Sequence, residues 1–115
     1  MRNATSLDPQ TRAALADFRS RLVQRYGSRM RGMILFGSRA RGDHRPDSDA
    51  DVAVFMGDTP DPISDQMDMA TEAYHVFLAD GVLIQPWVLK GTPEQPDLTY
   101  ADRLLKAVQS EGIPV

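Results

Sequence analysis

Apolar residues recur at helical spacing near the start of the chain. They stand three or four positions apart, with one further alanine, at Ala14, Leu15, Phe18, Leu22 and Tyr26. Asp8 followed by Pro9 is typical of a helix start, because the carboxylate accepts bonds from unpaired amides and a proline at the first helical position loses no hydrogen bond. Gly27 is a typical stop. The spacing therefore predicts a helix from Asp8 to Tyr26.

Two short apolar runs follow and predict buried strands. The first stretch, Met30–Phe36, holds the run Met33–Phe36, which is too short for a helix and apolar on both faces. A Gly37-Ser38 turn ends it, and residues 38–42 can form one or two helical turns. In the second run, Asp49–Met56, successive side chains point to opposite faces of the strand. One face carries Ala50, Val52, Val54 and Met56, and the other carries Asp49, Asp51, Ala53 and Phe55, so both carboxylates point the same way.

The second half of the chain predicts two more helices and a third strand. After Asp61-Pro62, apolar residues follow helical spacing until Asp80-Gly81, at Ile63, Met67, Ala70, Tyr74, Phe77 and Leu78. Such a stripe is typical of the face that a helix packs on its core, and we expect Tyr74 there. Residues 82–90 form a strand that Pro86, with no amide to donate, places at an edge or a bulge. Residues 99–110 form the last helix.

This order of elements predicts an α/β (α+β) domain with a small sheet of at least three strands flanked by helices. A chain of 115 residues fits one folding unit, residues 1–115. It has no cysteine and no apolar run long enough to span a bilayer, so we expect a cytoplasmic protein without disulfides or membrane contact. Ten arginines precede position 47, and those of the first helix are expected on its solvated polar face, which argues against direct nucleic-acid binding.

Asp49 and Asp51 need a physical explanation, because like charges on one strand face repel each other and lose solvation when partly buried. A divalent cation offsets both costs, and hard carboxylate oxygens suit Mg²⁺, which takes its remaining ligands from water and substrate phosphates. Glycine at position 37 lets backbone approach a phosphate, and Ser38 offers a hydroxyl and an amide. Arg39 and Arg41 could bind the same phosphates or a partner protein. Together these residues predict a site for a nucleoside triphosphate and magnesium.

The stretch GSRARGDHRPDSDADVAV resembles the signature of the DNA-polymerase-beta-like nucleotidyltransferases, specifically their minimal nucleotidyltransferases (MNT). The likeness lies in an apolar strand, Gly37-Ser38, ten intervening residues, Asp49-x-Asp51 and a second apolar strand. The resemblance implies the polymerase-beta-like fold with a mixed sheet, and one or two Mg²⁺ ions held by Asp49 and Asp51. It also implies transfer of a nucleoside monophosphate, AMP from ATP, to an acceptor hydroxyl.

One position departs from the family pattern. Active relatives usually carry a third carboxylate on the strand that corresponds to residues 82–90. Here the facing position is Gln85, which is neither a base nor a charged ligand. We therefore take Asp49, Asp51 and Gln85 as the three catalytic positions, of which only two are acidic. Trp87, two residues further along, is expected in the core or in an interface.

The resemblance leads to three functional hypotheses. In the first, the chain is the antitoxin of a toxin-antitoxin pair that binds a HEPN-type ribonuclease and adenylylates it on a hydroxyl side chain, with tyrosine as the expected acceptor. In the second, Gln85 marks a degenerate site, and the fold neutralises the toxin by binding alone. In the third, the chain is one subunit of a small-molecule nucleotidyltransferase of the aminoglycoside type. We also expect the chain to form a homo-oligomer or a hetero-oligomer.

Overall fold

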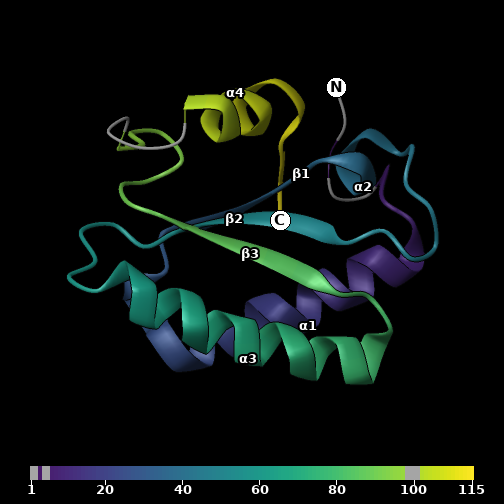
Figure 1. Cartoon of the computed structure of the whole chain (residues 1–115), viewed down its shortest axis with the longest axis horizontal. Helices are drawn as coiled ribbons and strands as arrows, with labels where there is room; N and C mark the ends of the chain where they lie inside the picture. Colours follow the sequence, from purple (N-terminus) through teal and green to yellow (C-terminus); the bar gives the residue numbers. More distant parts are fainter. Residues whose placement is uncertain (1–2, 4–5, 98–101) are drawn as a thin grey trace.

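A computed structural model describes residues 3, 6–97 and 102–115 of the chain. The elements in chain order are α1 (Pro9–Tyr26), the 3-10 turn η2 (Gly27–Arg29), β1 (Gly32–Phe36), α2 (Ser38–Arg41), β2 (Ala50–Phe55), α3 (Pro62–Asp80), β3 (Ile84–Leu89), α4 (Asp102–Glu111) and β4 (Ile113–Pro114). Figure 1 shows α1 and α3 side by side below the sheet and α4 above it. The predicted start of the last helix, near Thr99, lies outside the described residues.

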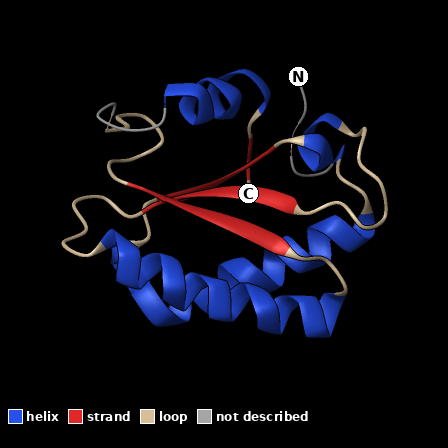
Figure 2. Cartoon of the chain, viewed as in Figure 1, coloured by secondary structure: helices blue, strands red, loops and turns tan. Residues whose placement is uncertain are grey.

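The four strands form one mixed sheet in the order β3-β2-β1-β4 (Figure 2). β1 runs antiparallel to both β2 and β4, whereas β2 and β3 run parallel. The crossover between the parallel strands is α3, which packs on the sheet beside α1. The architecture confirms the predicted mixed sheet flanked by helices and adds a fourth strand. Residues 113–114 had given no strand signal, because a strand of two residues has no periodicity to detect.

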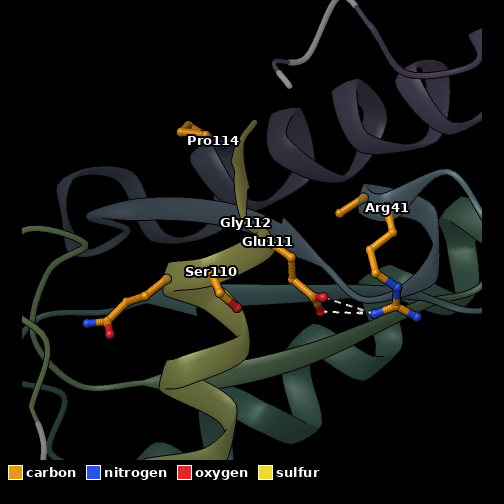
Figure 3. A pocket seen from close by; sticks show the side chains of 7 residues that line it. Arg41, Ser110, Glu111, Gly112 and Pro114 are labelled. Carbon is orange, nitrogen blue, oxygen red and sulfur yellow. Dashed lines mark hydrogen bonds and ion pairs between the residues drawn. The ribbon is translucent and has the colours of Figure 1, made fainter. Parts of the chain in front are cut away.

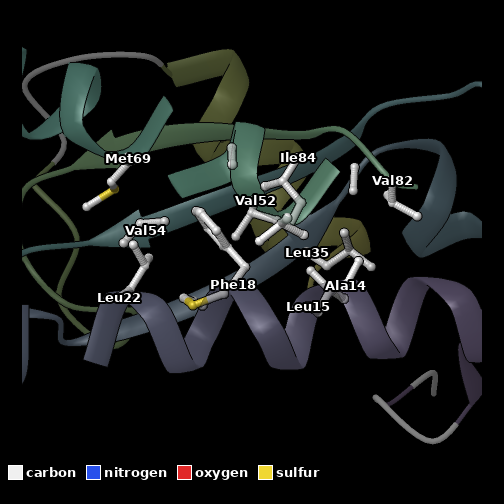
Figure 4. Close-up of a cluster of buried hydrophobic side chains, with 14 of the residues drawn as sticks. Ala14, Leu15, Phe18, Leu22, Leu35, Val52, Val54, Met69, Val82 and Ile84 are labelled. Atoms are coloured by element: carbon white, nitrogen blue, oxygen red, sulfur yellow. The ribbon is translucent and has the colours of Figure 1, made fainter. Parts of the chain in front are cut away.

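The main core lies between the sheet and the α1–α3 layer (Figure 4). Its fully buried members include Phe18 and Leu22 from α1, Leu35 from β1 and Val52 from β2. These are the positions that the alternating and helical patterns had assigned to the interior. A second, smaller cluster on the other face of the sheet joins the strands to α4 through Phe36, Ala53, Phe55 and Val108.

The long helices begin and end where the capping residues predict. Asp8 accepts hydrogen bonds from the amide and the hydroxyl of Thr11, at 3.0 and 2.7 Å. Asp61 caps α3 in the same way, accepting from the amide of Ser64 at 3.0 Å. Glycines follow the last residues of both α1 and α3. Local sequence therefore sets the ends of these two helices.

The buried face of α3 differs from the prediction. The apolar stripe from Ile63 to Leu78 faces outward, and Tyr74 is 56% exposed instead of belonging to the core. The buried residues are Asp65, Met69, Ala73 and Val76. Asp65 turns inward because the Arg29 guanidinium lies 3.0 Å from it and the Thr59 hydroxyl donates to it. Helical spacing alone does not show which of two apolar faces meets the core, and these polar contacts decide it.

The expected edge position of the Pro86 strand is confirmed, since β3 is the outermost strand of the sheet. Gln66 of α3 covers part of this edge. Its side-chain amide donates to the Pro86 carbonyl at 2.6 Å, and its side-chain oxygen accepts from the Val88 amide at 3.0 Å. The bonds block backbone groups that would otherwise be open to pairing with another strand.

Among the described residues, no helix is long and apolar enough to cross a membrane.

Candidate active site

Asp51 lies near the start of β2, on the side of the sheet that α4 covers, and Asp49 comes directly before the strand. Asp51 alternates with Ala53 and Phe55, which pack against Val108 of α4. The Cα atoms of Asp51 and Gln85 are direct partners in the parallel β2–β3 register, so the facing position expected for residue 85 is observed. Asp49 is exposed and Asp51 is half-buried. One carboxylate is therefore open to water while the other is fixed in the protein.

The surroundings of Asp51 disfavour its charged form. Burial raises the pKa of the Asp51 carboxyl above its ordinary value, and the negative charges of Asp49 and Glu111 act in the same direction. A hydrogen bond from the Trp87 indole, at 3.3 Å, and the charge of Arg41 oppose this rise. A divalent cation between the two aspartates would supply the positive charge that the site lacks.

Gly37 places the turn after β1 directly against Asp51. Its φ of 81° is a conformation that residues with a side chain rarely adopt. A Cβ atom at this position would also lie 2.6 Å from Oδ2 of Asp51. Only glycine therefore allows the turn and the carboxylate to approach each other this closely. Ser38 follows as the first residue of α2.

An acidic side chain already binds to this turn. The Gly37 amide donates to Oε1 of Glu111 at 2.9 Å. Arg41 donates through Nη1 to both carboxylate oxygens of Glu111, at 3.2 and 3.0 Å (Figure 3). The Gly37 amide and the Arg41 guanidinium thus form a place where an anionic oxygen binds, next to the paired aspartates.

The end of the chain fixes Glu111 in this position. Glu111 is the last residue of α4, and β4 pairs with β1 directly after it. Gly112 links the two, and a Cβ there would lie 2.5 Å from Cγ2 of Ile34 and closer still to the carbonyl oxygen of Val108. Because only a residue without a side chain fits, helix, link and strand hold Glu111 against the turn.

The two arginines of the motif have different surroundings. Arg39 is 2% exposed, and its guanidinium donates to the Ser48 carbonyl at 2.9 Å, the Thr11 hydroxyl at 2.9 Å and the Pro46 carbonyl at 3.1 Å. Its donors hold the loop before β2 on α1, so the structure favours a structural role over the expected phosphate contact. Arg41 has a half-exposed side chain paired with Asp43 and Glu111.

Sequence reasoning missed two residues of the site, Glu111 and Trp87. Glu111 comes from the far end of the chain, and only its place at the close of an apolar helix could have drawn attention to it. Trp87 lies two residues after Gln85 and therefore on the same face of β3. Its side chain is 40% exposed and donates a hydrogen bond to Asp51, so the predicted core position is wrong, while the interface position stays a prediction.

The paired aspartates suit a cation that takes its remaining ligands from water or phosphate. Within the described part of the chain, no three Asp, Glu, His or Cys side chains converge to enclose a metal ion. Asp49 and Asp51 could supply two carboxylate ligands, and water or phosphate oxygens would complete an octahedral Mg²⁺ shell. A cavity of about 500 Å³ lies beside the Glu111–Arg41 pair, lined by Ala40, Arg41, Gln109, Ser110, Glu111, Gly112 and Pro114 (Figure 3).

Comparison with known proteins gives a family and a fold. A model of the nucleotidyltransferase domain family matches residues 15–107, which is most of the chain. No curated protein sequence matches. A crystal structure described as a toxin-antitoxin with AMP-PNP is 21% identical, with a TM-score of 0.59 over 84% of this chain and 68% of that one.

Two further solved structures are similar. One is a mutant of the toxin-antitoxin MntA-HpeT, 20% identical with a TM-score of 0.59 over 84% of this chain and 68% of that one. The other is a putative nucleotidyltransferase from Sulfolobus solfataricus, 18% identical with a TM-score of 0.48 over 93% of this chain and 86% of that one. The family model over residues 15–107 shows that the chain belongs to the nucleotidyltransferase domain family, and with it that the chain has the DNA-polymerase-beta-like nucleotidyltransferase fold.

Proposed function

We propose that the chain is an MNT-type antitoxin that transfers AMP from ATP, in the presence of Mg²⁺, to a hydroxyl side chain of a HEPN-type ribonuclease. The observation that carries the proposal is the position of Asp51, two residues after Asp49, against a glycine turn whose amide binds an anionic oxygen. The toxin-antitoxin descriptions of two similar structures, one with AMP-PNP, support the choice of partner and nucleotide.

Each residue of the site has a role in this reaction. Asp49 and Asp51 would hold Mg²⁺, which would supply positive charge to neutralise the phosphates. The Gly37 amide, Ser38 and Arg41 bind the outer phosphates in place of the Glu111 carboxylate. The acceptor oxygen then bonds to the α-phosphorus while the bond from that phosphorus to the bridging oxygen breaks, releasing pyrophosphate. Because Gln85 cannot take a proton, a base of the bound partner accepts the hydroxyl proton.

Intact-mass spectrometry of a co-expressed HEPN-type ribonuclease tests this function. We expect the ribonuclease to gain adenylate in the presence of the parent chain and none in the presence of the Asp49→Ala plus Asp51→Ala variant. An unmodified ribonuclease with the parent chain would contradict the enzymatic part of the proposal. The same adduct with the double variant would contradict the assigned site.

A second candidate function is neutralisation by binding alone, and Gln85 is the observation that favours it. Its backbone pairs with that of Asp51, so an acid on this strand would be well placed there, yet the residue has no charge. Cell survival separates the two candidates. A double aspartate variant that protects cells as well as the parent would favour binding alone, and a variant that gives no protection would favour transfer.

A further inference from the structure

The outward face of α3 carries an apolar stripe that no other part of the described chain covers. Its large side chains are exposed by between 43% and 75%, and they are Ile63, Met67, Tyr74, Phe77 and Leu78. Figure 1 shows α3 along the outside of the molecule. Isolated exposed apolar residues are ordinary, but a contiguous row of this length on one helix marks an interaction surface.

The spacing of the stripe identifies the shape of what binds to it. Positions 63, 67, 70, 74 and 77 are separated by alternating steps of four and three residues. This is the heptad pattern of a seam between two helices. Ala70 lies near the middle, where a small side chain lets a second helix come close. The expected occupant is therefore another helix with a matching apolar seam.

The seam is complementary to itself. If an antiparallel copy of α3 crosses it at Ala70, Ile63 of one copy faces Phe77 of the other, and Met67 faces Tyr74. Large side chains then flank a pair of small ones, and each apolar residue meets another apolar residue. A two-fold axis of this kind produces an isologous interface, the commonest kind in homo-oligomers.

The charges of α3 are compatible with such pairing. A two-fold axis brings side chains near the axis close to their own copies, so acids within the seam would repel each other. The seam contains none, and Ser64 and Thr71 lie along its flank. The nearby acids Asp68 and Glu72 instead pair with Arg25 of α1, at 3.2 and 3.3 Å.

We propose that α3 pairs antiparallel with α3 of a second copy of this chain. An aromatic side chain carries about 150–250 Å², so the exposed fractions of the stripe leave on the order of 500 Å² open on each copy. Two such faces together reach roughly 1,000 Å², the lower limit for a biological interface and the size typical of a weak, reversible one. The helix lies across the sheet from Asp51, so pairing leaves both active sites accessible and does not depend on the proposed function.

Sedimentation of the full chain over the micromolar range tests the proposal. We expect a dimer, and we expect Met67→Asp or Tyr74→Asp to be monomeric with a native circular dichroism spectrum, because both side chains are mostly exposed. Val23→Asp is the matched control, since Val23 is an apolar residue, 47% exposed, on α1. A monomer at every concentration would overturn the proposal and leave the stripe to a different partner.

Disulfide trapping gives a second test, because the chain contains no cysteine. Two helices in close contact place the Cα atoms at their crossing within the range that a disulfide spans. Under mild oxidation Ala70→Cys should form a covalent dimer, whereas Ala79→Cys, an exposed position of α3 outside the seam, should not. Equal cross-linking of the two variants would contradict the antiparallel pairing.

Discussion

Arg39 and Arg41 show how far two neighbouring residues of the same type can differ in function. The guanidinium of Arg39 bonds to two carbonyls and a hydroxyl inside the protein, whereas Arg41 is half exposed and pairs with Glu111. The sequence places both beside the glycine turn. Only the path of the loop before β2 separates the structural arginine from the one that can reach a phosphate.

Stability measurements on alanine variants test this division. We expect Arg39→Ala to lower the free energy of unfolding by about 2–4 kcal/mol, because it leaves buried acceptors unpaired. Arg41→Ala should change it by less than about 1 kcal/mol, as is usual for an exposed ion pair, and should instead weaken ATP binding. Urea unfolding and calorimetric titration with ATP measure the two effects. Equal losses of stability in the two variants would contradict the assignment.

Glu111 binds the Gly37 amide and Arg41, where we propose that the outer phosphates bind, so it should compete with phosphate. We expect Glu111→Gln to tighten ATP binding by roughly threefold to tenfold, close to 1 kcal/mol, because the amide binds Arg41 more weakly and does not repel phosphate. Titration calorimetry with ATP and Mg²⁺ measures this. Glu94→Gln, which removes the same charge from an exposed loop, is the control. A Glu111→Gln variant that binds ATP no better than the parent would show that Glu111 is not a competitor.

Among the elements, α1 and β2 follow directly from local sequence, while α3 and β4 do not. Capping residues and a single apolar face specify α1, and a short apolar run bounded by turn residues specifies β2. Helix α3 has apolar residues on two faces, and the polar contacts of Asp65 decide which one is buried. Strand β4 forms only because the chain end reaches β1. Pattern therefore predicts elements well and their orientation only where one face is clearly polar.

The cap of α1 gives a prediction at the level of one helix. Asp8→Ala should lower the free energy of unfolding by about 1 kcal/mol at neutral pH, since it removes the acceptor for the Thr11 amide. Burial tends to raise the pKa of Asp8, but hydrogen bonds from Thr11 outweigh it and leave that pKa below its ordinary value of 3.8. The charged cap therefore adds its full share to the free energy of unfolding above pH 3.8. That share is lost as the pH falls through the pKa of Asp8 in the folded protein, which lies below 3.8.

Urea unfolding of the parent and the Asp8→Ala variant over a range of acidic pH measures that loss. The difference in stability between the two proteins should be constant near neutral pH and shrink under strongly acidic conditions. Asp8→Asn, which keeps a capping oxygen without the charge, should show a smaller difference with less pH dependence. A difference that grows as the pH falls would contradict the role of the charged cap.

At the scale of the whole molecule, the motif predicted half of the candidate site. Strand alternation predicts Asp49 and Asp51 on one face. The parallel pairing of β2 with β3 places the backbone of Gln85 opposite that of Asp51, as expected. The other half depends on contacts across the fold. Glu111 arrives from the last turn of α4, and Trp87 acquires its bond to Asp51 from the pairing of β2 with β3. Neither contact leaves a local signal in the sequence.

Calorimetric titration of the chain with ATP, with and without Mg²⁺, tests the central claim that Asp49 and Asp51 form a metal-dependent nucleotide site. The parent should bind ATP in the presence of Mg²⁺ and at least tenfold more weakly when the metal is chelated, a difference of about 1.4 kcal/mol. The Asp49→Asn plus Asp51→Asn variant should show weak binding in both conditions. Tight, Mg²⁺-dependent binding by this double variant would place the site elsewhere in the protein.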